Sequence, residues 1–270
     1  MGLLPPAGSL AVSLALLVAA APPARAEGED APAAAAAASV EECLRRNLPQ
    51  RSSVQSVRFQ SKDRTGSTRT IAGTAYWKKG EGELSRSLIR IDFPPDLRGS
   101  AYLLIEKPEK VDVFVYLPEY QKVRRITSHA LAGSLFGTDF SYEDMRRLRH
   151  LFEAAAAEAL PDAEVAGRAV RVVRLVPPAE SEYGEVQARV DAVTCVPLEI
   201  DLYARSGTLA KQLVADPSSL SRHGSVWVAH SVLLRDLQEQ TETRLELGKL
   251  EVDVEVPDRM FSERTLTQGN

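Results

Sequence analysis

The sequence predicts a single α+β domain that is mainly β, built on an antiparallel sheet of about 11 strands. Short segments with apolar residues at every second position recur at near-regular intervals, and turns rich in glycine, proline and charged residues separate them. A strong helix-start signal interrupts this series once, near residue 141. The 270 residues show no internal repeat and suffice for one sizeable core.

The N-terminus has the pattern of a secretory signal peptide. An uncharged apolar run, Leu10 to Ala21, precedes an A-x-A cleavage pattern that ends at Ala26. The run is too short to span a membrane. Cys43 lies well beyond it, so it is not the lipid-modified cysteine of a lipobox. We therefore expect residues 1–26 to be removed and the mature chain to be a soluble periplasmic protein.

Residues 27–38 are expected to form a flexible linker, and residues 39–270 a single domain. A capping-box pattern that begins at Ser39 predicts a short helix to about residue 47. Six strands are then expected, at residues 54–59, 68–77, 84–93, 101–106, 111–117 and 121–126. In the third of these, alternation places Phe93 on the same packed face as Ile89 and Ile91.

The helix-start signal lies at Ser141. Its hydroxyl suits the N-cap, and Asp144 suits the reciprocal bond of a capping box. Apolar residues then follow the 3.6-residue period as far as Ala159. We therefore expect a helix from Ser141 to about residue 160.

Six further strands are expected, at residues 169–175, 185–193, 198–203, 209–214, 225–234 and 241–250. In the last strand, Leu245 and Leu247 share one parity, whereas Leu250 has the other. Gly248 lies between the two sets, so a β-bulge there is expected to bring all of them to one face. Residues 258–266 are expected to form a short closing helix.

Several runs resemble one protein family. The run GSLFGTDFSYEDM, from Gly133 to Met145, and the preceding VFVYLPEYQKVRRI resemble the bacterial outer-membrane lipoprotein-sorting proteins, the LolA-like superfamily. Shorter matches are AYWKK, PPDLRGSAYLLIE, DAEVAGRAV and TCVPLEIDLY. The resemblance covers about residues 40–265. It implies an unclosed, curved sheet (a half-barrel) whose concave face is covered by two or three helices around an apolar cavity for acyl chains.

The resemblance and the apolar pattern indicate where a ligand would bind. The candidate cavity and lid residues are Leu103, Ile105, Val113, Val115, Leu135, Phe136, Phe140, Tyr142 and Met145. Gly133 and Gly137 are candidate hinges of a lid. The aromatic residues of this run have a second interpretation, in which they pack the loop onto the sheet, and both interpretations stay open.

The inventory of chemical groups favours a binding protein over an enzyme. No phosphate-binding glycine loop or nucleophile elbow is present, and no two of the four histidines are spaced for a shared metal site. We therefore expect no catalytic residue, no metal and no cofactor. The net charge is −4, and loss of Arg25 with the signal makes it −5. A mildly acidic, exported protein is a poor candidate for binding nucleic acid, so no nucleic-acid partner is expected. The arginines 146, 147 and 149 form either a solvated face or a docking surface.

Cys43 and Cys195 are 152 positions apart in a chain expected in an oxidising compartment. The sequence leaves open whether they form a disulfide or two separate thiols.

These expectations together describe a non-enzymatic periplasmic carrier that binds the acyl chains of a lipoprotein or lipid and moves it towards the outer membrane. An inner-membrane transporter is a further candidate partner, and no stable membrane anchor is expected. Two alternatives use the same fold: a periplasmic sensor or regulator, and an accessory partner of a lipid exporter of the resistance-nodulation-division type.

Overall fold

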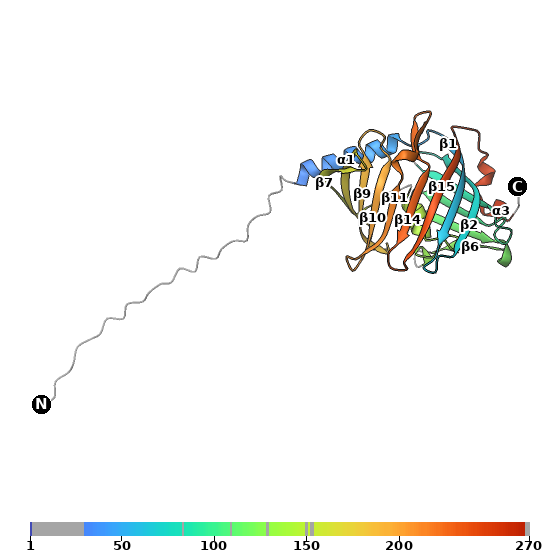
Figure 1. Ribbon diagram of the computed structural model, residues 1–270, viewed down its shortest axis with the longest axis horizontal. Coiled ribbons are helices and arrows are strands. Elements are labelled where there is room, and N and C mark those ends of the chain that lie inside the picture. Colours follow the sequence, from blue (N-terminus) through green and yellow to red (C-terminus); the bar gives the residue numbers. More distant parts are fainter. Residues whose placement is uncertain are drawn as a thin grey trace.

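The computed structural model describes Met1 and residues 30–82, 84–108, 110–127, 130–148, 151 and 154–267 (Figure 1). The expected signal peptide, apart from Met1, lies outside these residues. A 13-stranded antiparallel sheet has the order β6-β5-β4-β3-β2-β1-β15-β14-β11-β10-β9-β8-β7, and a separate hairpin pairs β12 with β13. Nowhere in the described part of the chain is a helix long and apolar enough to span a membrane.

The main strands are β1 (Ser52–Lys62), β2 (Thr68–Lys79), β3 (Ser85–Phe93), β4 (Ala101–Lys107), β5 (Lys110–Leu117), β6 (Lys122–Ile126), β7 (Ala156–Val165), β8 (Arg168–Val176), β9 (Tyr183–Asp191), β10 (Pro197–Ala204), β11 (Leu209–Ala215), β14 (Ser231–Asp236) and β15 (Thr241–Val252). The hairpin strands are β12 (Leu220–His223) and β13 (Val226–Ala229). The helices are α1 (Asp30–Arg46), α2 (Tyr142–Arg147) and α3 (Glu263–Leu266). The expected strands are present except that the one expected at residues 225–234 is divided into β13, in the hairpin, and β14, in the main sheet. The unclosed, mainly β fold class is confirmed.

The sheet consists of two meanders joined by the pairing of β1 with β15. Strands β6 and β7 follow one another in sequence, yet they are the two opposite edges of the sheet. The segment between them therefore has to cross the sheet from edge to edge. It crosses on the concave face, because Leu135, Phe136 and Phe140 are buried there in the main core with Phe59 and Ile71.

The helix expected from Ser141 to residue 160 is wrong in its length. α2 ends at Arg147, and residues 156–160 belong to β7, which pairs with β8 from Ala156↔Val176 onwards. An alanine-rich run favours a helix in isolation. In the folded protein this run instead forms backbone hydrogen bonds with β8. The pairing with β8 outweighs the helix propensity of the alanines. This unrecognised strand is one reason why the sheet has 13 strands and not about 11.

The first helix also differs from the expectation. α1 begins at Asp30, so most of the stretch expected to be a linker is helical. Ser39 lies inside the helix, where its hydroxyl donates to the carbonyl oxygen of Ala36, and it is not an N-cap. Figure 1 shows α1 lying against the half of the sheet that contains β7 to β11. Ala37 and Val40 bury one side of α1 in the main core.

The opposite, convex face is covered at one end by the C-terminal segment. Leu88, Leu103 and Phe114 pack there against Phe261 and Leu266. α3 therefore lies on the face opposite to α1 and α2, and two helices cover the concave face.

Two β-bulges decide which side chains face the concave side. On β15, Leu247 and Leu250 are three positions apart, whereas their partners on β1, Val57 and Gln55, are only two positions apart. The bulge predicted at Gly248 is therefore confirmed. A Cβ at Gly248 would lie 2.2 Å from the Oγ atom of Ser56, so a larger residue there would require the Ser56 side chain to move. On β3, a second bulge between Ile91 and Phe93 turns Phe93 to the other face, where 48% of it is exposed. The expectation that Phe93 packs with Ile91 was wrong for this reason.

Candidate functional site

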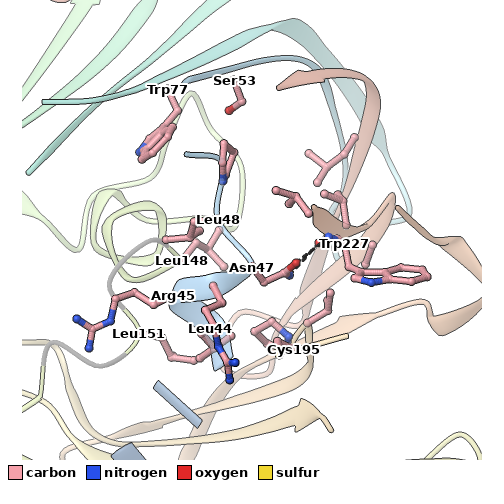
Figure 2. A pocket seen from close by; sticks show the side chains of 18 of the residues that line it. Leu44, Arg45, Asn47, Leu48, Ser53, Trp77, Leu148, Leu151, Cys195 and Trp227 are labelled. Carbon is pink, nitrogen blue, oxygen red and sulfur yellow. Dashed lines mark hydrogen bonds between the residues drawn. The ribbon is translucent and has the colours of Figure 1, made fainter. Parts of the chain in front are cut away.

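A cavity of about 780 Å³ lies on the concave side of the sheet, below the C-terminal end of α1. Its floor is apolar and comes from four strands of the C-terminal meander: the residues are Ile200, Leu213, Val232, Leu245, Leu247 and Leu250. Its cover comes from the end of α1 and from the chain after α2. Figure 2 shows Leu44, Leu48, Leu148 and Leu151 grouped around this end of α1.

Charged residues line the cavity at exposed and at buried positions: Glu41, Glu42 and Arg45 are partly exposed, whereas Arg147 is buried. Arg45 forms ion pairs with Glu41 and Glu42, and these side chains are all 41–55% exposed. A cavity of this volume lies within the range of small-molecule sites, which are mostly apolar with a few polar groups that orient the ligand. The arrangement suits a molecule with a hydrocarbon part and a polar end.

Two long-range links hold the cover in place. Cys43 in α1 forms a disulfide with Cys195, and their Cα atoms are 5.4 Å apart, which is ordinary for a disulfide. Asn47 forms two hydrogen bonds with the backbone of Trp227 in β13: its Nδ2 atom donates to the carbonyl oxygen at 3.0 Å, and its Oδ1 atom accepts at 2.7 Å (Figure 2). The cysteine pairing that the sequence left open is thus a disulfide.

Asp191 shapes the turn that presents Cys195. Its carboxylate accepts hydrogen bonds from the backbone N–H and the hydroxyl of Thr194 and pairs with Arg168 at 2.6 Å. Burial alone raises the pKa of Asp191, but the bonds from Arg168 and Thr194 outweigh this effect and lower the pKa to about 2. The turn therefore keeps its charged anchor throughout the physiological pH range.

The segment that crosses the concave face is fastened by buried polar contacts. Lys211 in β11 donates from Nζ to the Asp144 carboxylate and to the carbonyl oxygen of Asp139, both at 2.9 Å. The hydroxyl of Tyr183 donates to the same Asp144 carboxylate at 2.7 Å. A buried ion pair joins Arg147 to Glu143 at 2.8 Å. Residues 139–147, the C-terminal part of the crossing segment, are therefore held by several buried hydrogen bonds and ion pairs.

The capping box predicted at Ser141 is confirmed. Its hydroxyl accepts from the N–H of Asp144 at 3.0 Å, and the Asp144 carboxylate accepts from the N–H of Ser141 at 2.8 Å. Ser141 also donates to Glu182 at 3.1 Å. Burial and the neighbouring Asp144 carboxylate raise the pKa of Glu182.

We expect Ser141→Ala to lower the free energy of unfolding by about 1–2 kcal/mol, because the substitution removes the cap. Ser39→Ala is the matched control, since that exposed hydroxyl lies inside α1 and alanine favours a helix. Urea denaturation measures both variants. A Ser141→Ala midpoint as high as that of Ser39→Ala would show that the cap does not stabilise the domain.

The structure divides the nine predicted ligand-binding residues between two faces. Seven belong to the concave core: Val113, Val115, Leu135, Phe136, Phe140, Tyr142 and Met145. Leu103 and Ile105 face the convex side and pack with Phe114. None of the nine lines the 780 Å³ cavity, although Val113 lines a second, more polar cavity of about 730 Å³ beside β5 and β6.

The aromatic residues of the crossing segment are packed in the core. Phe140 is fully buried and meets Phe59 edge to face, with ring centroids 5.8 Å apart. Tyr142 stacks on Tyr102 at 6.1 Å. These contacts favour the second interpretation of the sequence, in which the loop packs onto the sheet.

The two glycines predicted as hinges have local roles in this structure. Gly137 has a φ of 80°, a backbone conformation that favours glycine. A Cβ at Gly133 would lie 3.0 Å from the carbonyl oxygen of Ala130 and 3.2 Å from the Tyr142 ring. Both positions suit glycine without any motion, so the hinge role stays a prediction.

Sequence reasoning missed the cavity because its lining residues come from many elements. Leu245, Leu247 and Leu250 were a partial signal, since the predicted bulge brings them to one face. A second missed feature is a pair of histidines. The Nε2 atoms of His223 and His230 are 3.0 Å apart, although the sequence offered no spacing for a shared site.

The comparisons with solved structures identify the class of fold. A putative outer membrane lipoprotein-sorting protein domain from Vibrio parahaemolyticus is 22% identical, with a TM-score of 0.77 over 89% of this chain and 100% of its own. A DUF1329 family protein from Desulfovibrio piger is 24% identical, with a TM-score of 0.80 over 87% of this chain and 99% of its own. A LolA superfamily protein from Nitrosomonas europaea is 19% identical, with a TM-score of 0.67 over 84% of this chain and 97% of its own. The fold is therefore LolA-like.

A family model described as "Uncharacterized protein" matches residues 83–268. Because the match covers more than half of the chain, the protein belongs to this family. The search of curated proteins finds no match.

Proposed function

We propose that this protein is a non-enzymatic carrier that binds the acyl chains of a lipid or lipoprotein in the 780 Å³ cavity. The observation that carries the proposal is the apolar floor that leucine, isoleucine and valine residues of four strands form, with exposed ion pairs of Arg45 in the same lining. The LolA-like fold supports it, since solved proteins of this fold include a putative lipoprotein-sorting domain. Transport towards the outer membrane, with an inner-membrane transporter as a further partner, belongs to the same proposal.

The energetics restrict how such a carrier works. Burying one acyl chain contributes roughly 0.8 kcal/mol per methylene, which is about 12 kcal/mol for about 15 methylenes. Three fully buried chains would exceed the practical ceiling of about 18–21 kcal/mol for non-covalent affinity. A carrier that releases its cargo therefore binds the chains incompletely. A cavity that is open at its mouth is consistent with such partial burial.

The proposal places the protein in the periplasm. The support is the apolar run from Leu10 to Ala21 with the cleavage pattern after it. The protein for binding experiments is best purified from a periplasmic extract, where its intact mass should correspond to a chain that starts at Glu27. An uncleaved or lipid-modified mass would contradict the proposed location.

We expect the protein to bind a fluorescent fatty acid, and Val232→Trp to weaken this binding at least about tenfold. Val232 lines the cavity, and an indole there occupies the space of the ligand. Filling a cavity with apolar atoms commonly leaves stability unchanged or raises it. Leu247→Trp provides a second blocking variant on another strand. Fluorescence titration gives the affinity, and thermal unfolding gives the stability.

Val176→Trp is the matched control, because Val176 is 41% exposed on β8 and does not line the cavity. It should bind the probe as the wild type does. If both blocking variants fold and bind normally, the ligand does not occupy this cavity. If the wild type takes up no acyl probe, the carrier proposal fails, and a sensor or exporter-partner role becomes the better account.

A further inference from the structure

A group of three polar side chains lies at the hairpin β12–β13. Ser221 and His223 belong to β12, and His230 follows β13 directly. The Nε2 atoms of the two histidines are 3.0 Å apart. The hydroxyl oxygen of Ser221 lies 2.9 Å from the Nε2 atom of His223 and 2.7 Å from that of His230. The three donor atoms thus form a small, nearly equilateral triangle.

A backbone contact determines the tautomer of His230. Its Nδ1 atom is hydrogen-bonded to the carbonyl oxygen of Leu247 in β15. A carbonyl oxygen can only accept, so Nδ1 carries the proton and the neutral ring presents a lone pair at Nε2. Metal-binding histidines are commonly held in this way, with the second ring nitrogen donating to a carbonyl or carboxylate.

The spacing of the nitrogens matches that of two ligands on one metal ion. Metal–nitrogen bonds are about 2.0–2.1 Å, so two nitrogens at 90–110° around one metal lie about 2.9–3.4 Å apart. The observed 3.0 Å between His223 and His230 falls in this range. The two rings are tilted by 58° to each other, which is an unstacked arrangement.

We propose that His223 and His230 bind a divalent transition metal through their Nε2 atoms, with the Ser221 hydroxyl as a third contact. Imidazole nitrogen suits copper, zinc and nickel, and affinity for a given set of ligands is highest for Cu²⁺. The described residues contain no cluster of three or more His, Cys, Asp or Glu side chains suited to a metal. The site therefore leaves coordination positions for water or an added ligand, and Cu²⁺ is the ion expected to bind best.

The position of the site connects it to the cavity wall. Leu247, whose carbonyl oxygen orients His230, lines the cavity, and so does Trp227 on β13. A bound metal would fasten the two ends of the hairpin to each other and, through His230, to β15. Bound Cu²⁺ should therefore quench the fluorescence of Trp227, which gives an optical signal for occupancy.

The test uses the mature protein without a histidine tag. Equilibrium dialysis against Cu²⁺ and, separately, Zn²⁺ should give one equivalent of bound metal, with tighter binding of Cu²⁺. Electron paramagnetic resonance of the copper form should show nitrogen ligands. His223→Gln and His230→Gln should each lower Cu²⁺ affinity at least about tenfold. Each variant's circular dichroism without metal should match the wild type, because glutamine retains hydrogen-bonding groups.

His129→Gln and His150→Gln are the controls, since they replace the other two histidines of the chain and leave His223 and His230 in place. Both should bind Cu²⁺ as the wild type does. Cu²⁺ should raise the unfolding temperature of the wild type and of these controls, but not of the two hairpin variants. Wild-type affinity in His223→Gln or His230→Gln would overturn the proposal, as would the absence of a bound equivalent in the wild type.

If a hairpin variant misfolds, Cu²⁺ affinity is measured for Ser221→Ala instead. The loss of the third contact should weaken Cu²⁺ binding, and unchanged affinity would overturn the assigned geometry. This proposal does not depend on the carrier function.

Discussion

Replacing Cys43 and Cys195 together by serine is expected to lower the free energy of unfolding by about 2–5 kcal/mol. The disulfide joins residues 152 positions apart, so its removal releases a long loop in the unfolded chain. It also frees the end of α1 from the turn after β9. Because Leu44 and Leu48 at this end cover the cavity, affinity for an acyl probe should fall as well.

Guanidinium denaturation of the wild type with and without a reducing agent measures the same effect without a substitution. The double-serine variant serves as the control, since a reductant should leave its midpoint unchanged. A wild-type midpoint that does not move on complete reduction would contradict the prediction. Normal probe binding by the reduced protein would show that the disulfide does not hold the cavity cover.

Lys211→Met is expected to lower the free energy of unfolding by about 3–5 kcal/mol. The side chains of Lys211 and Asp144 are only 11% and 4% exposed, and the substitution leaves the Asp144 carboxylate buried without its cation. Burial on its own lowers the pKa of Lys211, but Asp144 and Glu182 outweigh this effect and raise it. The lysine is therefore charged in the folded protein.

Arg174→Met is the matched control, because Arg174 and Glu158 form an ion pair with both side chains nearly half exposed. This change should cost less than about 1 kcal/mol. Adding Asp144→Asn to Lys211→Met removes the uncompensated charge and should recover part of the loss. Urea denaturation compares the variants, and equal midpoints for Lys211→Met and Arg174→Met would refute the prediction.

Several local features were predictable from the sequence because they depend on residues close together in the chain. The capping box needs only Ser141 and Asp144, three positions apart, and it is present as expected. The bulge at Gly248 was visible as a change of parity among the leucines of one strand. Strands with clear alternation were found close to their true bounds.

Other features were ambiguous in the sequence because several structures satisfied the same pattern. β4 is apolar at five consecutive positions, so alternation could not assign Leu103 or Ile105 to a face. Their true side follows from the pairing Leu103↔Phe114 and from the C-terminal segment that covers the convex face. The alanine-rich run at residues 154–160 favours a helix locally, whereas β8 provides it with strand partners.

The sequence by itself thus determined the fold class, most of the strand series and the start of α2, since these depend on periodicity and short-range hydrogen bonds. Tertiary structure alone decided the disulfide, the cavity and the histidine pair. Each of these joins residues from separate elements: Cys43 with Cys195, the end of α1 with β15, and β12 with the residue after β13. Their proximity results from the register and curvature of the whole sheet, which no single segment encodes.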